Sequence, residues 1–220
     1  MNDFERALGA YFSAGQLAII QKTKIGIAGA GGLGSNIAAI LARSGFKDFS
    51  IIDLDVVEMK NLNRQHYFLA DIDQPKVDAI AKRLKDINPD LSLKMEKTYL
   101  NDGNIMDYFQ DRDVIFEAFD NVKSKKMLLE AFGNSGKLLV FGNGLAGISN
   151  QREIKIKEIK KNIFIVGDGL TCVGNENPPL APRVIACAAL MASVALERIL
   201  DDCGAAGRII HCEAAAAIES

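Results

Sequence analysis

A glycine-rich turn near residue 30 places the tightest constraint on how this chain can fold. Residues 24–28 form a short apolar run typical of a strand, and the sequence GAGGLG follows at Gly29–Gly34. Residues 35–44 then carry apolar side chains at helical spacing, and residues 49–52 are a second strand-like run. The pattern predicts strand, tight turn, helix and strand, a unit that binds nucleotides in α/β folds.

The glycines of this turn have separate physical tasks. Gly29 allows the tight turn, and Gly34 lets the helix pack close to the strand. Gly31 or Gly32 lets bare backbone amides approach a phosphate, at a helix N-terminus whose dipole favours an anion. Asp53 follows the last glycine by about 20 residues, where a carboxylate can accept both hydroxyls of a ribose. These residues predict a nucleotide site and fit both ATP and NAD.

The loop after the second strand carries groups that suit phosphate. Arg64 has a planar fork of donors that matches phosphate oxygens, and Asn61 can bond a phosphate or a loop carbonyl. Lys76 lies in the first turn of an amphipathic helix predicted over 74–88, where the helix dipole disfavours a cation. This position suggests that a ligand anion compensates for the dipole, although an exposed lysine at a helix start would also fit.

The remaining apolar patterns define the fold class. A helix is predicted over 2–21, strands over 91–98, 113–118 and 137–141, and helices over 101–108 and 122–132. Further on, strands are predicted over 152–157 and 163–166, a loop over 167–182 and a long helix over 183–200. The predicted fold is α/β, with a Rossmann-like, mainly parallel sheet, helices on both faces and antiparallel strands in the C-terminal part.

Length and charge bound the domain organisation and the partners. With 220 residues, 49% of them hydrophobic, the chain can bury one substantial core. We expect one domain over 1–220, divided into an N-terminal helix (1–22), a nucleotide-binding half (24–147) and a C-terminal part (148–220). The net charge of -2, with both signs interspersed, gives neither nucleic acid nor a membrane surface as a default partner.

The sequence shows no pattern of secretion, membrane insertion or metal-bound cysteines. It has neither a leader-like start nor an apolar run long enough to span a bilayer, so we expect a cytoplasmic protein. Its four cysteines form no C-x-x-C pair, so we expect neither a disulfide framework nor a structural zinc site.

Asp120 and Asn121 follow the strand predicted over 113–118. Ligands in open α/β sheets bind beyond the carboxyl ends of the strands, so these side chains should face the cleft of the glycine turn. Asp120 could hold a magnesium ion, and it could also cap the helix that begins at residue 122. The two roles can coexist.

Six short motifs occur in order along the chain. They are GAGGLGS at Gly29–Ser35, IIDLD at Ile51–Asp55, NLNRQ at Asn61–Gln65, QPK at Gln74–Lys76, INP at Ile87–Pro89 and AFDN at Ala118–Asn121. Together they resemble the ThiF/MoeB-type superfamily, related to ubiquitin-activating enzymes, which adenylates the C-terminal carboxylate of small β-grasp proteins. The short length and the segments GLAG, GD and APRV look most like the compact ThiF branch, assigned to the thiamine sulfur carrier ThiS.

The resemblance implies an adenylyltransferase that uses ATP and Mg²⁺. It would adenylate the C-terminal carboxylate of a ThiS-like β-grasp carrier ending in Gly-Gly and release pyrophosphate, in thiamine biosynthesis. Asp53 would hold the ribose, Asp120 the magnesium, and three further residues the triphosphate. With the glycines, the implied nucleotide-binding set is Asp53, Asp55, Asn61, Arg64, Gln65, Lys76, Asp120 and Asn121, of which Asn61, Arg64 and Lys76 hold the triphosphate.

Two further residues take their expected roles from the resemblance. Arg6 would correspond to the arginine that family members send into the neighbouring subunit's site, which implies a homodimer. Cys172 lies in the loop where sulfur-transferring members carry a reactive cysteine. It could carry a persulfide received from a sulfur-donor protein, or it could be an ordinary loop residue.

Charge explains why such a site needs cations and no strong base. A carboxylate that attacks the α-phosphorus of ATP is an anion meeting an anion, so Arg64, Lys76 and the helix amides would neutralise the phosphates. Three alternatives stay open: a different ubiquitin-like carrier, of the molybdopterin synthase small-subunit type; an NAD-dependent oxidoreductase; and the inactive half of a heterodimer. An oxidoreductase would leave Arg64 and Lys76 without a task.

Overall fold

The computed structural model describes residues 1–119, 122–148 and 153–201. Within these residues one sheet has the strand order β3-β2-β1-β4-β5-β7-β6. The strands are β1 (Lys24–Ala28), β2 (Asp48–Ile52), β3 (Ser92–Glu96), β4 (Val114–Glu117), β5 (Leu138–Gly142), β6 (Lys155–Lys160) and β7 (Ile163–Gly167). Every neighbouring pair is parallel except β6 and β7, which confirms the predicted α/β, Rossmann-like fold.

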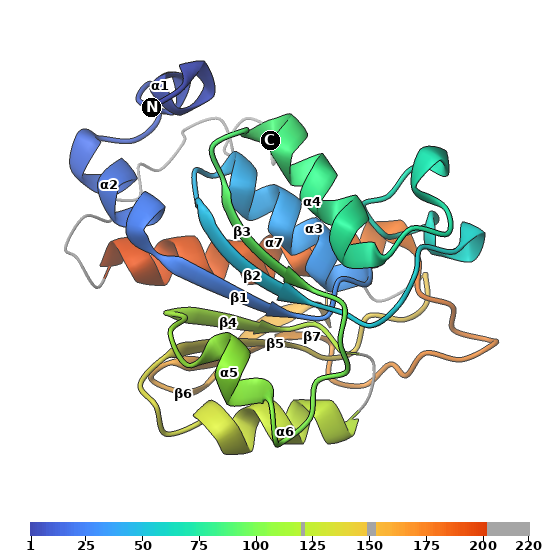
Figure 1. Ribbon diagram of the computed structural model, residues 1–220. Helices are drawn as coiled ribbons and strands as arrows, with labels where there is room; N and C mark the ends of the chain where they lie inside the picture. The colour runs from blue at the N-terminus through green and yellow to red at the C-terminus, as the bar shows by residue number, and fades with distance from the viewer. Residues whose placement is uncertain (120–121, 149–152, 202–220) are drawn as a thin grey trace, which may run out of the picture.

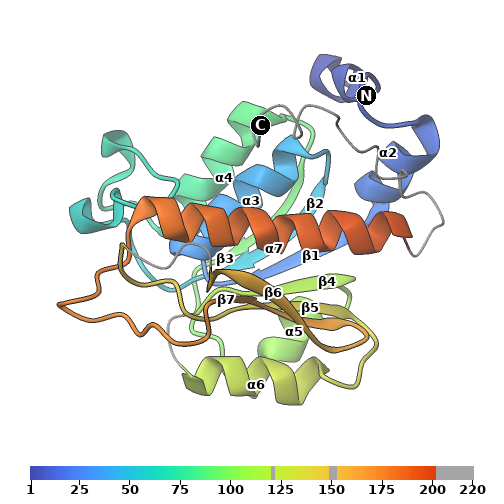
Figure 2. The same cartoon turned by 180° about the vertical axis from the view of Figure 1, so that it is seen from behind.

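Helices cover both faces of the sheet, as Figures 1 and 2 show. One face carries α3 (Gly32–Arg43), α4 (Lys76–Ile87) and α7 (Ala181–Asp201), and the other carries α5 (Ile105–Phe109) and α6 (Val122–Phe132). Because successive side chains of a strand point to opposite faces, Ile51 joins the core cluster on the first face and Ile52 joins the cluster on the second. None of the described helices is long and apolar enough to cross a membrane.

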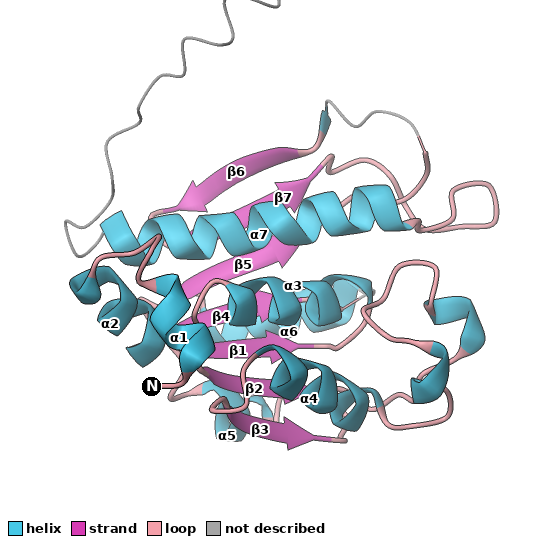
Figure 3. Cartoon of the chain, turned by 90° about the horizontal axis from the view of Figure 1, so that it is seen from above, coloured by secondary structure: helices cyan, strands magenta, loops and turns pink. Residues whose placement is uncertain are grey.

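The N-terminal segment forms two short helices, where one helix over 2–21 was predicted. They are α1 (Asp3–Leu8) and α2 (Ala14–Lys22), and Figure 3 shows both at the amino ends of β1 and β2. A capping box explains the break, because Ser13 accepts the amide of Gln16 and Gln16 accepts the amide of Ser13. Ser13 thus begins a new helix inside the predicted one.

The helix after the glycine turn begins earlier than predicted. Helix α3 begins at Gly32 instead of residue 35, so the glycines form its first turn. Gly29 has a φ of 103°, which favours glycine, and a Cβ on Gly34 would lie 1.8 Å from the carbonyl oxygen of Gly29. The predicted tasks of Gly29 and Gly34 are therefore confirmed.

The C-terminal part differs in detail from its prediction. Strand β7 pairs in parallel with β5, so within the described residues only β6 runs antiparallel, and β6 lies over 155–160 rather than 152–157. Helix α7 begins at Ala181, two residues earlier than predicted. Pro182 does not delay it, because the first turn of a helix tolerates a residue without an N–H group. Two short 3-10 helices, Met59–Asn61 and Leu69–Asp71, lie in the connection between β2 and α4.

Candidate functional site

The chain connections diverge to opposite sides of the sheet between β1 and β4. From β1 the chain passes through α3 to β2 on one side, and from β4 it passes through α6 to β5 on the other. Ligands of open α/β sheets bind at such a switch point, beyond the carboxyl ends of the strands. The glycine turn and Asp53 directly follow β1 and β2, at the ends to which the strand arrows point in Figure 3.

Asp53 holds the glycine turn in place. Its Oδ2 atom accepts the amide of Ala30 at 2.6 Å, and its Oδ1 atom accepts the amide of Asp55 at 2.8 Å. Burial raises the pKa of Asp53, and the charge of Lys76 opposes this rise. Because a carboxylate has about four acceptor positions, two remain for a ligand hydroxyl.

Lys76 is buried and already faces two carboxylates. Its Nζ atom lies 2.6 Å from Oδ2 of Asp55 and 3.9 Å from Oδ1 of Asp53. A lysine in the first turn of a helix needs a nearby anion, and the sequence analysis assigned that anion to a ligand. The structure corrects this reasoning, because protein carboxylates already compensate the charge of Lys76.

The loop between β2 and α4 is fastened to the first turn of α3. The side-chain amide of Asn36 donates to the carbonyls of Gly32 and Arg64, at 2.7 and 2.8 Å. The hydroxyl of Tyr67 donates to the carbonyl of Ala30 at 2.7 Å. Sequence analysis missed Asn36 and Tyr67, because an asparagine inside a helix and an isolated tyrosine give no signal until the loop is seen against the turn. Asn61 is also occupied, since its Oδ1 accepts the amide of Glu58.

The side chains of Arg64 and Gln65 lie against the glycines, and part of their hydrogen-bonding capacity is unused within the described residues. The aliphatic part of Arg64 runs beside Gly32, and within the described residues its guanidinium donates to the carbonyl of Lys60 and to the side-chain oxygen of Asn63. Partial burial lowers the pKa of Arg64 from its ordinary value. The side chain of Gln65 lies next to Gly31, and its buried Oε1 atom has no hydrogen-bond partner within the described residues. A buried acceptor without a partner is costly, which indicates a missing donor.

Two other predicted residues, Arg6 and Cys172, do not join this cluster, and two more cannot be placed. Asp120 and Asn121 lie outside the described residues. Arg6 is an exposed residue of α1, at the opposite end of the sheet, where it pairs with Asp3. Cys172 is exposed in the loop after β7. In the part of the chain that the structure describes, no three His, Cys, Asp or Glu side chains form a metal-binding group.

An apolar face formed by Leu8, Tyr11 and Phe12 was also predicted from the sequence to mediate a homodimer, and in the structure it is largely turned inward. Leu8 is buried and lies beside Gly45, and Phe12 packs against the main core, whereas Tyr11 is exposed. Leu8, Tyr11 and Phe12 therefore do not form one exposed apolar surface.

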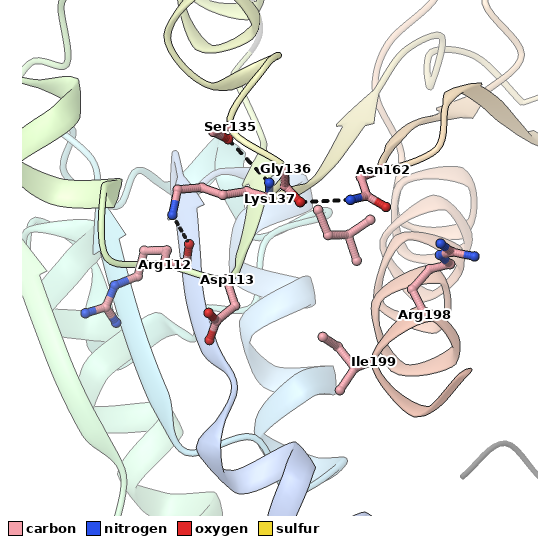
Figure 4. Close-up of a pocket in the computed structure, with 9 residues that line it drawn as sticks. Arg112, Asp113, Ser135, Gly136, Lys137, Asn162, Arg198 and Ile199 are labelled. Atoms are coloured by element: carbon pink, nitrogen blue, oxygen red, sulfur yellow. Dashed lines mark hydrogen bonds between the residues drawn. The ribbon is translucent and has the colours of Figure 1, made fainter. Parts of the chain in front are cut away.

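A cavity of about 320 Å³ lies at the opposite, amino edge of the sheet, between the starts of β4, β5 and β7 and the end of α7 (Figure 4). Hydrogen bonds join several of the residues that line it. Lys137 donates to the carbonyl of Arg112, and Asn162 donates to the carbonyl of Gly136. This cavity contains none of the residues predicted to bind a nucleotide.

Comparison with protein families gives one match across almost the whole chain. The model of the ThiF family matches residues 4–202. The chain is 30% identical over 159 residues to the tRNA threonylcarbamoyladenosine dehydratase of Haemophilus influenzae, covering 71% of this chain and 60% of that protein. It is also 30% identical over 124 residues to the sulfur carrier protein adenylyltransferase of Thermus thermophilus, covering 56% of this chain and 46% of that protein. The chain thus spans less than two thirds of both relatives.

A solved structure shares the fold. The Escherichia coli tRNA N6-threonylcarbamoyladenosine dehydratase, in complex with ATP, superimposes with a TM-score of 0.83 at 19% sequence identity, covering 92% of this chain and 96% of that chain.

These comparisons contradict one prediction from the sequence. The chain was expected to adenylate a ThiS-like carrier in thiamine biosynthesis, whereas the Haemophilus relative and the Escherichia coli structure are named for a tRNA nucleoside. The physical reason is that the motifs at Gly29–Ser35, Ile51–Asp55, Asn61–Gln65 and Gln74–Lys76 lie at the glycine turn and in the loops beside it, and so specify the nucleotide rather than the second substrate. Because both names refer to tRNA, the prediction that nucleic acid is not a default partner has no support from the comparisons.

Proposed function

The chain belongs to the ThiF family, and from that premise we propose that it uses ATP to activate a carboxylate of a modified tRNA nucleoside. The substrate proposed is the threonylcarbamoyl group of threonylcarbamoyladenosine, which the names of the Haemophilus relative and the Escherichia coli structure specify. The observation that carries the proposal is a pair of polar groups at the glycine turn. The Arg64 guanidinium has no carboxylate partner among the described residues, and the buried Oε1 atom of Gln65 has no hydrogen-bond partner there.

The nucleotide fits the side chains at the carboxyl edge. A Cβ on Gly31 would meet only Nε2 of Gln65, at 3.9 Å, so the backbone here is open to a phosphate. The amides at the start of α3 and the guanidinium of Arg64 supply positive charge at the same place. Asp53 keeps free acceptor positions for the ribose hydroxyls.

The proposed reaction follows from the charges of its partners. A carboxylate oxygen of the threonyl group attacks the α-phosphorus of ATP, the bond to pyrophosphate breaks, and an acyl adenylate forms. A nucleophile within the same nucleoside then displaces AMP, so the tRNA loses one water overall. No general base is needed in the first step, because a carboxylate is already ionised at neutral pH. Arg64 and Lys76 would hold the triphosphate, and Lys76 would exchange part of its pairing with Asp55 for the phosphate.

Magnesium belongs to the same proposal. Mg²⁺ in such sites is held by one or two carboxylates together with substrate phosphates, so a full protein cage is not required. Asp120 would supply that carboxylate and so hold the ion beside the phosphates. The ion would supply further neutralisation of the triphosphate.

The test uses tRNA with and without the modification. Purified protein is incubated with ATP, Mg²⁺ and tRNA that carries threonylcarbamoyladenosine, and AMP release and the mass of the digested nucleoside are followed. We expect AMP and a nucleoside lighter by one water, and neither product with the matched tRNA that lacks the modification. Release of AMP with a β-grasp carrier ending in Gly-Gly, and none with the modified tRNA, would contradict the proposal.

A further inference from the structure

A glutamate and a lysine without a role in the proposed ATP contacts are paired beside the glycine turn. Glu117 is the fully buried last residue of β4, and Lys125 lies in the first turn of α6. The Nζ atom of Lys125 is 2.5 Å from Oε2 of Glu117. Burial raises the pKa of Glu117 to about 7, while the charge of Lys125 opposes the rise. Because Glu117 is fully buried and Lys125 is partly buried, forming the pair has a desolvation cost.

The ammonium group of Lys125 has an acceptor for each of its protons. Besides Glu117, it donates to the carbonyl of Gly142 at 2.8 Å and to the carbonyl of Phe119 at 3.2 Å. The Oε1 atom of Glu117 accepts the amide of Phe119 at 2.8 Å. The pair thus holds both backbone groups of Phe119 and ties them to the end of β5.

The backbone held by the pair lies directly against the nucleotide turn. A Cβ on Gly29 would lie 3.0 Å from the carbonyl oxygen of Ala118, so these two backbones are in close contact. A Cβ on Gly142 would lie 2.3 Å from Cδ1 of Leu33, in the first turn of α3. The ends of β4 and β5 therefore pack directly against the glycine turn and the first turn of α3.

Stability alone does not explain an ion pair at this place. The cost of removing two charges from water offsets most of their attraction, and apolar replacements of buried pairs are often equally stable. An apolar pair could not supply the three directed bonds that fix two carbonyls and a carboxylate. We propose that Glu117 and Lys125 are positioning residues, which hold the ends of β4 and β5 against the glycine turn for the chemical step. This inference rests on the proposed function.

A double variant separates positioning from folding. Glu117→Leu with Lys125→Met removes both charges and leaves no unpaired ion in the core. The matched control is Lys126→Met with Glu130→Leu, an exposed pair on the same helix. We expect the first double variant to keep its melting temperature and bind ATP within about threefold of the parent, while kcat falls by about tenfold or more because the reacting groups are misplaced. The control should keep parental kcat.

A kcat within about threefold of the parent in the folded double variant would overturn the inference. If that variant does not fold, Lys125→Arg provides the second test, because it keeps the buried charge. A planar guanidinium does not reproduce the three bonds of an ammonium, so kcat should fall several-fold at an unchanged melting temperature. Parental kcat in Lys125→Arg would also contradict the positioning role.

A separate measurement distinguishes failure of this inference from failure of the proposed function. If the parent releases no AMP with modified tRNA, the proposed function fails. Amide hydrogen exchange over residues 117–119 still reports on the pair, and it should be faster in the first double variant than in the control. Equal exchange in the two would show that the pair does not hold this backbone.

Discussion

The two edges of the sheet differ in how completely their charged groups are paired. At the amino edge, Arg112 contacts Asp48 at 2.5 Å and Asp111 at 2.6 Å, and Lys137 donates to two backbone carbonyls. These groups surround the cavity of Figure 4 and leave little for a ligand to bind. The amino edge therefore has an open space whose main charges are already satisfied.

The carboxyl edge shows the opposite arrangement. Among the described residues, Arg64 has no carboxylate partner and Oε1 of Gln65 has no hydrogen-bond donor. Both lie against glycines whose backbone is open on one side. The difference teaches that a cation without a carboxylate partner beside open backbone marks the binding edge better than the volume of a cavity does.

The largest expected effect concerns the packing of the glycine turn itself. Gly34→Ala should abolish the folded state, because the added Cβ would lie 1.8 Å from the carbonyl oxygen of Gly29. Gly31→Ala should fold, since its Cβ meets only Gln65. It should lose ATP affinity, because the same Cβ occupies the space through which a phosphate reaches the backbone. Thermal unfolding and ATP titration check the two variants, with Gly15→Ala, whose Cβ meets no atom within 4 Å, as the control. A normally folded Gly34→Ala protein would refute the steric argument.

The second effect is a pH dependence of stability that arises at the carboxyl edge. Glu117 has a folded pKa of about 7 against an ordinary 4.5, so its protonation stabilises the folded state. This contribution is complete below pH 4.5 and is lost as the pH rises through about 7, up to about 3 kcal/mol. At the amino edge, Asp111 has a pKa lowered by Arg112, so its contribution is present above pH 3.8 and is lost only at lower pH.

Urea unfolding between pH 4.5 and pH 7 measures this difference. The free energy of unfolding of the parent should fall with pH relative to that of Glu117→Gln, which cannot titrate. Parallel pH profiles for the two proteins would remove Glu117 as the cause.

The third effect tests the cations of the binding edge. Arg64→Ala and Lys76→Ala should each reduce ATP-dependent turnover by roughly a hundredfold, because each removes a fixed charge that faces the phosphates. Arg198→Gln, in the cavity of the amino edge, should stay within about twofold of the parent. AMP release under saturating ATP gives the comparison. Turnover of Arg64→Ala close to that of Arg198→Gln would mean that the two edges do not differ in function.

Sequence patterns predicted the fold well where local and long-range preferences agree. The glycine turn, the parallel strands and helix α6 follow from apolar spacing and from close packing that only glycine allows. The break after α1 was missed because the capping box of Ser13 competes with a continuous helical pattern. The edge strand β6 shifted by three residues, because both its faces are exposed and its apolar pattern sets the register only weakly.

The candidate site was predicted less completely than the fold. Motif spacing pointed to Asp53, residue type pointed to Arg64, and the family resemblance added Gln65, yet none of these could show that Lys76 pairs with Asp55. Residue types alone do not reveal which neighbouring charge is closest. The pairing of Glu117 with Lys125 was invisible for the same reason, since eight positions separate two residues that meet only when β4 and α6 pack.

The smallest expected effect concerns the exposed loop after β7. Activation by ATP uses phosphates and a carboxylate, and neither requires a thiol, so Cys172→Ser should keep AMP release within about twofold of the parent. The same assay measures it. If the rate of AMP release fell by tenfold or more, this loop would take part in the chemical step. A tenfold fall corresponds to about 1.4 kcal/mol of transition-state stabilisation.

The most direct test of the account follows an oxygen atom. Threonylcarbamoyladenosine tRNA is prepared with isotopically heavy oxygen in the threonyl carboxylate and is turned over with unlabelled ATP. If the carboxylate attacks the α-phosphorus, heavy oxygen appears in the AMP that is released, because the oxygen that bridged carbon and phosphorus leaves with phosphorus. Label-free AMP, or heavy oxygen in inorganic phosphate, would contradict carboxylate adenylation at the glycine turn.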